Sequence, residues 1–230
     1  MTAPERADAT SAERQEDIKE TGRLEAFSDG VFAIAITLLV LNIQVPAHLD
    51  SGWAKDWGQV KSLWPQYLAY VLSFVTILIM WVNHHLVFRL IHRTNQLFLM
   101  LNGLLLMCIT FLNFPTALLA ASLQHGNTTV ATLTYNGTLI VISVFFNLVW
   151  RYATYHDRLL DAHADRALVR TIHRQYRLGP LYYGVPFVVA LVSPALSIGL
   201  DLALAVYFSL TGVVRLTRDT EPADAPLLPR

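Results

Sequence analysis

One membrane-length apolar segment near the N-terminus, residues 23–43, most constrains how this chain can fold. About 20 helical residues at 1.5 Å each span roughly 30 Å, the thickness of the hydrocarbon core of a bilayer. The first third of the segment nevertheless carries Arg23 and Asp29. Charged side chains are costly inside a membrane, so we expect both to have partners or contact with water.

The composition of the whole chain agrees with a membrane protein. Of its 230 residues, 54% are hydrophobic and 15% are charged, which is too apolar for an ordinary soluble domain. The formal net charge is zero, which argues against a nucleic-acid partner. The single cysteine, Cys108, excludes a framework of disulfides within the chain.

Hydropathy predicts six transmembrane segments. We expect these segments to be helices, because lipid cannot form hydrogen bonds with the backbone of an open sheet edge. The expected fold class is therefore an all-α polytopic membrane protein whose channel domain covers 23–216. The polar ends, 1–22 and 217–230, are expected to be disordered cytoplasmic tails. Pro115 predicts a kink or an early end in the third helix. The six segments cover residues 23–43, 65–88, 95–121, 133–150, 179–194 and 197–216.

The basic residues predict the orientation of these helices. With the six predicted spans, 15 of the 17 Lys and Arg residues fall on one side of the membrane, and only Lys55 and Lys61 on the other. The basic side of a membrane protein is the cytoplasmic side. We therefore predict a multi-pass protein of the plasma membrane with both termini in the cytoplasm. Trp53, Trp57 and Trp64 are then expected at the outer interface.

This orientation brings polar side chains of the first three helices to a similar depth. We predict that Asp29 bonds to one or more of Arg23, His84 and His85, because polar groups in a membrane pair across helices. We interpret the cluster as a structural network. A proton-sensing role is the alternative, since histidine beside a carboxylate can titrate near neutral pH. No further ligands are spaced for a metal. The predicted network comprises Arg23, Phe27, Ser28, Asp29, His84 and His85, with Asn95, Gln96 and Asn102 at the start of the third helix.

A second pattern in the first helix is an aliphatic stripe. At about 100° per residue, its members fall on one face within about 100° of arc, and Asp29 lies nearly opposite. The polar cluster therefore faces the bundle of its own subunit, and the stripe faces lipid, another helix or a pore axis. The stripe consists of Ile34, Thr37, Leu38 and Leu41, and Phe27 continues it toward the cytoplasm.

Three stretches of the sequence together resemble the transmembrane protein 175 family, which contains the lysosomal potassium channel and its bacterial relatives. The resemblance covers about residues 22–216 by helix number and length, but its specific motifs lie in the first two helices. They are Arg23-x-x-x-Phe27-Ser28-Asp29, Ile34-x-x-Thr37-Leu38-x-x-Leu41 and Trp81-x-x-His84-His85.

The resemblance implies a potassium-preferring cation channel and not an enzyme, with K⁺ as the permeant ion and no cofactor. Bacterial members are homotetramers in which each subunit contributes its first helix to a central pore, with membrane lipids around it. The family lacks a Thr-Val-Gly-Tyr-Gly filter, and none occurs in this sequence. Carried over by position, the pore constriction is made by Ile34, Leu38 and Leu41, and Thr37 matches a threonine tied to potassium preference.

Other classes of function remain open at this point. A proton-coupled secondary transporter with a polar site formed by helices 1–3 is the alternative, and Gly179, Pro180 and Pro186 give it weak support as helix interruptions. A membrane enzyme would need a catalytic set. The three histidines at 156, 163 and 173 suggest one, but the basic loop that holds them is better interpreted as solvated or facing headgroups. A scaffold without transport would show no conductance.

Overall fold

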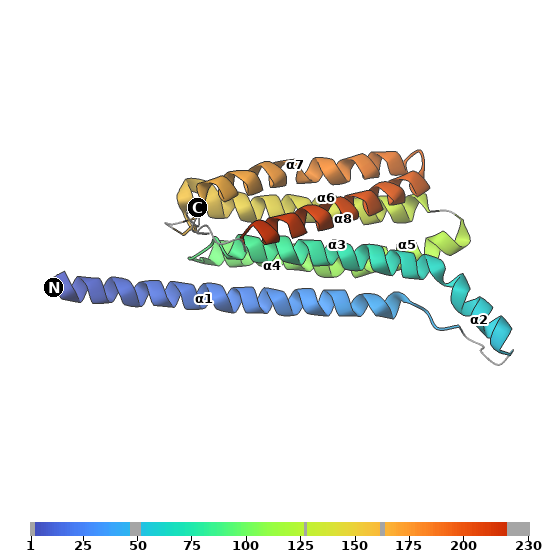
Figure 1. Ribbon diagram of the computed structural model, residues 1–230, viewed down its shortest axis with the longest axis horizontal. Helices are drawn as coiled ribbons and strands as arrows, with labels where there is room; N and C mark the ends of the chain where they lie inside the picture. Colours follow the sequence, from blue (N-terminus) through green and yellow to red (C-terminus); the bar gives the residue numbers. More distant parts are fainter. Residues whose placement is uncertain (1–2, 47–51, 127, 162–163, 220–230) are drawn as a thin grey trace, which may run out of the picture.

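The computed structural model describes residues 3–46, 52–126, 128–161 and 164–219, and these are almost entirely helical. In Figure 1, α1 runs along one side of a long bundle, α6 and α7 lie on the far side, and α3 and α4 lie between them. The helices are α1 (Ala3–Leu38), α2 (Trp53–Ser62), α3 (Trp64–Phe88), α4 (Gln96–Phe111), α5 (Asn113–His125), α6 (Thr129–Thr154), α7 (Arg166–Ala190) and α8 (Pro194–Asp219), with short 3₁₀ turns at Leu39–Asn42 and Tyr155–Asp157.

The predicted all-α membrane class is confirmed. Within the described ranges, four helical stretches are long and apolar enough to cross a membrane: Lys19–Asn42, Trp64–Phe88, Gln96–Gln124 and Thr129–Asp157. A fifth apolar helix, Pro194–Leu210, is shorter. All six predicted segments fall largely within helices, but their number as membrane spans stays a prediction.

The predicted interruption near Pro115 is also confirmed. Helix α4 ends at Phe111 and α5 begins at Asn113, with Leu112 between them. A proline ring clashes with the carbonyl group four residues earlier and removes a backbone donor. For Pro115 that carbonyl belongs to Phe111, so the break falls where the proline forbids a regular hydrogen bond.

Helix α7 begins 13 residues before the predicted segment 179–194, at Arg166. Its first half is amphipathic: Ile172 is buried while Arg170 and Arg174 are exposed. A hydropathy average cannot detect such a helix, because the basic residues cancel the apolar ones. Asp165 caps the start by accepting a hydrogen bond from the backbone N–H of Ala167 at 2.7 Å.

The structure describes helix within parts of both predicted tails. Helix α1 extends through the N-terminal segment back to Ala3, where the sequence predicted disorder over 1–22. This segment is rich in Ala, Glu, Arg, Gln and Lys, which are good helix formers. At the other end α8 continues to Asp219, and the rest of the predicted tail lies outside the described residues.

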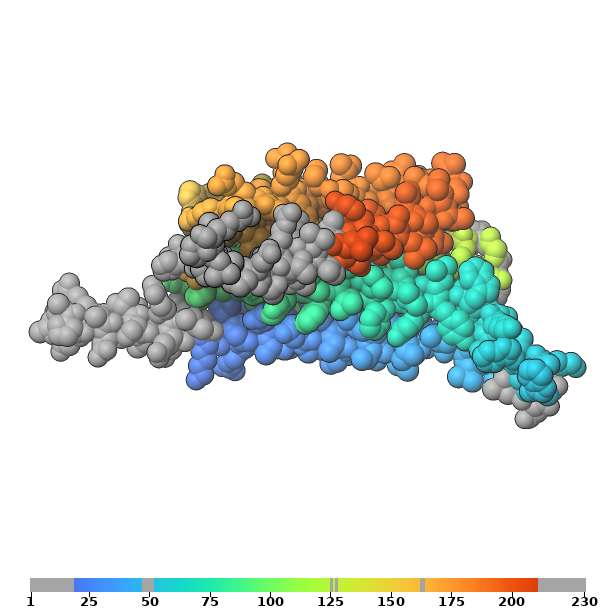
Figure 2. All heavy atoms as spheres, in the orientation of Figure 1, coloured from blue at the N-terminus to red at the C-terminus, as the bar shows by residue number. Residues whose placement is uncertain are grey.

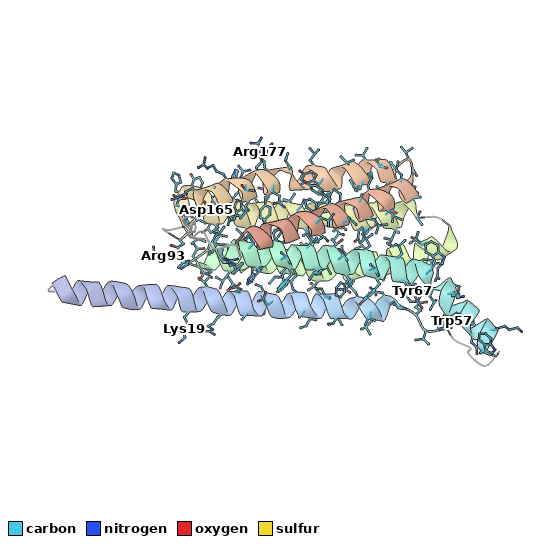
Figure 3. The ribbon with its side chains drawn as sticks, viewed as in Figure 1. Lys19, Trp57, Tyr67, Arg93, Asp165 and Arg177 are labelled. Carbon is cyan, nitrogen blue, oxygen red and sulfur yellow. The ribbon has the colours of Figure 1, made fainter. Side chains whose placement is uncertain are left out.

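The two ends of the bundle differ in chemistry. Figure 3 shows Lys19, Arg93 and Asp165 toward one end and Trp57 and Tyr67 toward the other. At the basic end, the α3–α4 and α6–α7 connections are joined by an antiparallel bridge between Ile91 and Leu160. Which of the two ends faces the cytoplasm stays a prediction from the basic residues.

Candidate functional site

The aliphatic stripe of α1 lies on the surface of the isolated subunit. The exposed fractions are 61% for Phe27, 58% for Ile34, 45% for Leu38 and 73% for Leu41. Phe32, Ala35 and Leu39 on the opposite face are buried in the bundle. Figure 2 shows α1 along one edge of the molecule, with the rest of the bundle on one side of it only. The predicted division of this helix into two faces is therefore confirmed.

Helix α1 is also the least buried of the four long spans. Only 22% of its most apolar stretch is buried within the subunit, against 44% for the Trp64–Phe88 span. An unpartnered apolar face of this length needs lipid or another copy of the chain to cover it.

The end of the stripe departs from regular α-helix. From Leu39 to Asn42 the chain tightens into a 3₁₀ turn, which advances about 120° per residue and not 100°. The direction of the Leu41 side chain around the helix axis therefore differs from the direction predicted at 100° per residue. Its side chain is nevertheless the most exposed of the stripe, and Val40 beside it is 50% exposed.

Thr37 is the one polar member of the stripe. Its Oγ1 lies 3.0 Å from the backbone oxygens of both Ala33 and Ile34. A hydroxyl has one hydrogen to donate, and here the backbone accepts it. The lone pairs of Oγ1 therefore stay available as acceptors on the exposed face.

Behind the stripe, a chain of hydrogen bonds crosses three helices. His84 Nε2 on α3 lies 2.9 Å from Asn102 Oδ1 on α4, and Asn102 Nδ2 donates to Ser28 Oγ on α1 at 3.0 Å. Ser28 Oγ in turn donates to the backbone oxygen of Leu24 at 2.8 Å. Ser28, His84 and Asn102 are all buried. This direction of donation requires the hydrogen of His84 on Nε2, and the network holds α1 against α3 and α4.

The predicted partner of Asp29 is wrong. Its Oδ1 accepts a hydrogen bond from Trp81 Nε1 at 2.8 Å, and not from Arg23, His84 or His85. His85 instead pairs with Glu25 through Nδ1 at 2.9 Å and stacks on the ring of Trp81. A hydropathy pass counts tryptophan as apolar, so the indole N–H that reaches Asp29 was not considered.

Two members of the predicted network lie outside it. Arg23 is exposed and makes no hydrogen bond or ion pair with the described residues, and Phe27 points out with the stripe. Both lie on the exposed face of α1, while Ser28 and Asp29 turn toward the bundle. At 100° per residue both positions fall on the side of the stripe, which agrees with their exposure.

Sequence reasoning missed the contacts that hold the C-terminal end of the first span. Asn113 Nδ2 lies 3.3 Å from the backbone oxygen of Ala35, and Asn42 Nδ2 lies 3.3 Å from the backbone oxygen of Asn113. Gln66 Oε1 accepts from the backbone N–H of Gln44 at 2.7 Å. Asn113 and Gln66 are isolated amides in apolar helices, a pattern that signals pairing across helices.

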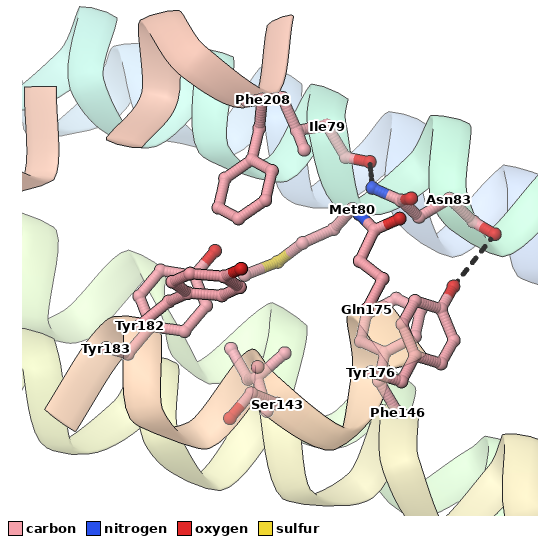
Figure 4. A pocket seen from close by; sticks show the side chains of 12 residues that line it. Ile79, Met80, Asn83, Ser143, Phe146, Gln175, Tyr176, Tyr182, Tyr183 and Phe208 are labelled. Atoms are coloured by element: carbon pink, nitrogen blue, oxygen red, sulfur yellow. Dashed lines mark hydrogen bonds between the residues drawn. The ribbon is translucent and has the colours of Figure 1, made fainter. Parts of the chain in front are cut away.

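A cavity of about 530 Å³, a volume that includes its open side, lies between α3, α6, α7 and α8. Figure 4 shows Met80, Tyr182, Tyr183 and Phe208 around it. No lining residue belongs to α1, so the cavity is separate from the stripe. Within the described ranges, no cluster of three or more His, Cys, Asp or Glu side chains could hold a metal ion.

Long apolar helices joined by buried polar side chains define this protein as a polytopic α-helical membrane protein. The family described as endosomal/lysosomal potassium channel TMEM175 matches residues 23–112, which hold the stripe and the network. The chain is also 52% identical over 191 residues to a Chamaesiphon minutus protein named a potassium channel, covering 83% of this chain and 94% of that one. The chain belongs to the TMEM175 family.

Two further relatives agree. A Streptomyces collinus protein named a potassium channel is 38% identical over 203 residues, which cover 88% of this chain and 98% of the relative. The crystal structure of a lysosomal potassium-selective channel TMEM175 homolog from Chamaesiphon minutus superposes with a TM-score of 0.76 at 48% identity, covering 84% of this chain and 98% of that chain. The predicted family is therefore confirmed.

Proposed function

We propose that this protein is a potassium-permeable cation channel in which four copies surround one pore lined by α1. The observation that carries the proposal is the exposed aliphatic stripe on the least buried of the four long spans. The buried network on the opposite side of α1 fixes which face turns outward. The names of the relatives as potassium channels support the same function.

In this proposal Ile34, Leu38 and Leu41 form stacked rings around the central axis. Aliphatic side chains offer a cation no replacement for its hydration shell, so a narrow ring blocks ions by excluding water. Opening then requires the rings to move apart until a hydrated or partly hydrated ion passes. The gate is therefore hydrophobic, and no carbonyl-lined filter is needed.

Thr37 supplies the oxygen ligands in this arrangement. Its hydroxyl hydrogen is directed to the backbone of its own helix, which leaves the oxygen lone pairs facing the proposed axis. A ring of such oxygens stabilises a partly dehydrated cation. We therefore assign the preference for K⁺ to Thr37 and the constriction to the aliphatic residues on either side.

We further propose that the protein lies in the plasma membrane with the basic end of the bundle in the cytoplasm. Lys19 and Arg93 lie at this end, and Trp57 lies at the opposite one (Figure 3). Trp53 and Trp57 on α2 are exposed, as expected for aromatic side chains at the outer interface.

The experiment is a flux assay on purified protein in liposomes. A potassium gradient with a protonophore present should give K⁺ flux that rises linearly with concentration and needs no proton gradient. Flux that saturates and stops when the proton gradient is removed would favour the proton-coupled transporter. If neither K⁺ nor Na⁺ crosses the liposome membrane, the channel proposal is refuted and a scaffold without transport becomes the better interpretation.

A further inference from the structure

We propose that the outward face of α7 binds the anionic headgroups of phospholipids at the basic end of the bundle. This site is separate from the proposed pore and does not depend on it. The basic face consists of Arg170, His173, Arg174 and Arg177, and all four side chains are exposed. Helix α7 contains no Asp or Glu, so nothing on the helix itself neutralises this face. In Figure 3, Arg177 lies on the side of α7 that points away from the other helices.

The same row of side chains becomes apolar further along the helix. Leu181, Val185 and Val188 continue the row at spacings of four, four and three residues, and their exposed fractions are between 50% and 63%. Such spacings keep side chains on one helix face. A face that changes from arginine to aliphatic side chains passes from the headgroup layer into the acyl chains.

A hydrogen bond between α6 and α7 sets the depth of the basic face. Pro180 has no N–H for the backbone oxygen of Tyr176, and Asn147 Nδ2 donates to that oxygen instead at 2.7 Å. Tyr176 is therefore level with Asn147, which lies seven residues, or about 10 Å, inside the end of α6 at Thr154.

Arg177 is next to Tyr176 and thus lies at the inner edge of the basic face. Arg170 lies about 10 Å nearer the end of the bundle. The headgroup layer of one leaflet is roughly 5–8 Å thick, so the face spans this layer and reaches the acyl boundary. An exposed guanidinium at that depth extends toward phosphate, which it binds in a bidentate geometry.

The arginines of this face are available for such contacts. Arg166, at the start of the helix, pairs with Asp157 at 2.7 Å. Arg170 donates from Nε to the backbone oxygen of Arg166 at 3.2 Å. Arg174 and Arg177 are exposed and make no hydrogen bond or ion pair with the described residues. The opposite side of α7 is fixed on the bundle, because Tyr176 Oη donates to the backbone oxygen of Asn83 at 3.3 Å and Ile172 is buried. These contacts determine which face of α7 turns away from the bundle.

The test is a lipid titration of the purified full chain in neutral detergent. Binding of phosphatidylglycerol and of phosphatidylcholine is followed by native mass spectrometry and by the shift in melting temperature. We expect wild-type protein to prefer phosphatidylglycerol, and the R170Q/R174Q/R177Q variant to bind it about 100-fold more weakly. The R170K/R174K/R177K variant keeps the charge and should keep most of the preference. The K55Q/K61Q variant removes charge at the other end and should bind as wild type does.

Three results would overturn the proposal. The first is wild-type affinity for phosphatidylglycerol in the triple glutamine variant. The second is equal stabilisation by inorganic phosphate alone, which would indicate a site for free anions and not for lipid. The third is a preference that persists in about 0.5 M salt, where an exposed electrostatic contact is screened. The salt arm uses wild-type protein, so the proposal stays testable even if the glutamine variant does not fold.

Discussion

The buried hydrogen bonds behind α1 predict a specific pattern in the stability of Asn102 variants. Asn102→Leu keeps the approximate size of the side chain but removes its hydrogen-bonding groups. His84 Nε2 then loses its acceptor, and because His84 Nδ1 has no partner among the described residues, both ring nitrogens become unpaired. An unpaired buried group costs about 1–2 kcal/mol in a membrane protein. For a chain of this size that lowers the melting temperature by about 2–8 °C.

A second substitution should restore much of this loss. His84 stacks on Phe88 at 4.4 Å and meets the edge of Phe32 at 5.2 Å between ring centroids. His84→Phe therefore keeps an aromatic ring in the same surroundings and removes the unpaired nitrogens. Replacing both partners of a buried hydrogen bond by apolar groups of similar shape can be nearly neutral. We expect N102L/H84F to be more stable than N102L alone.

The assay is thermal unfolding in detergent, monitored by size-exclusion chromatography. Thr134→Val serves as control, because Thr134 is only half-buried and its hydroxyl bonds to the backbone of its own helix. An unchanged melting temperature in N102L, or a double variant whose losses simply add, would refute the reasoning.

Three further predictions concern the pore and its support. Ile34→Ala and Leu41→Ala should each raise basal K⁺ flux in liposomes severalfold, because a wider ring admits water, and unchanged flux in both would remove them from the pore. Thr37→Val keeps the shape but removes the oxygen, so the K⁺/Na⁺ permeability ratio from reversal potentials should fall toward one while current persists; an unchanged ratio would exclude Thr37 as a ligand. Trp81→Phe leaves Asp29 without its 2.8 Å donor and should lower the melting temperature by an amount that corresponds to about 1.5–3 kcal/mol, whereas equal stability would show that this bond is dispensable.

The periodicity of α1 was readable from the sequence because a helix of known pitch converts spacing into direction. The spacing placed Ile34 and Leu38 on one face and Asp29 nearly opposite. In the structure Ile34 and Leu38 are exposed, while Asp29 turns to Trp81 in the bundle. The break before Pro115 followed from a steric rule that holds in any helix. These features depend on local geometry alone.

The partners of the polar groups were not readable in the same way. Asp29 had several candidates at similar depth, and which one meets it depends on how α1 and α3 rotate against each other. The indole of Trp81 fills that position, and His85 turns to Glu25. Likewise Asn113 and Gln66 bond to backbone groups that no side-chain pattern identifies. Long-range packing decides these contacts.

The most direct test of the central claim is disulfide cross-linking between copies in the membrane. In a background without Cys108, Leu38→Cys places a thiol on the stripe, and Val141→Cys places one on an exposed position of α6. Thiols link only when their Cα atoms come within about 7 Å. The proposal predicts oxidised dimers with Cys at position 38 and none with Cys at position 141. Monomers at position 38, or dimers at position 141 alone, would show that α1 does not face a shared axis.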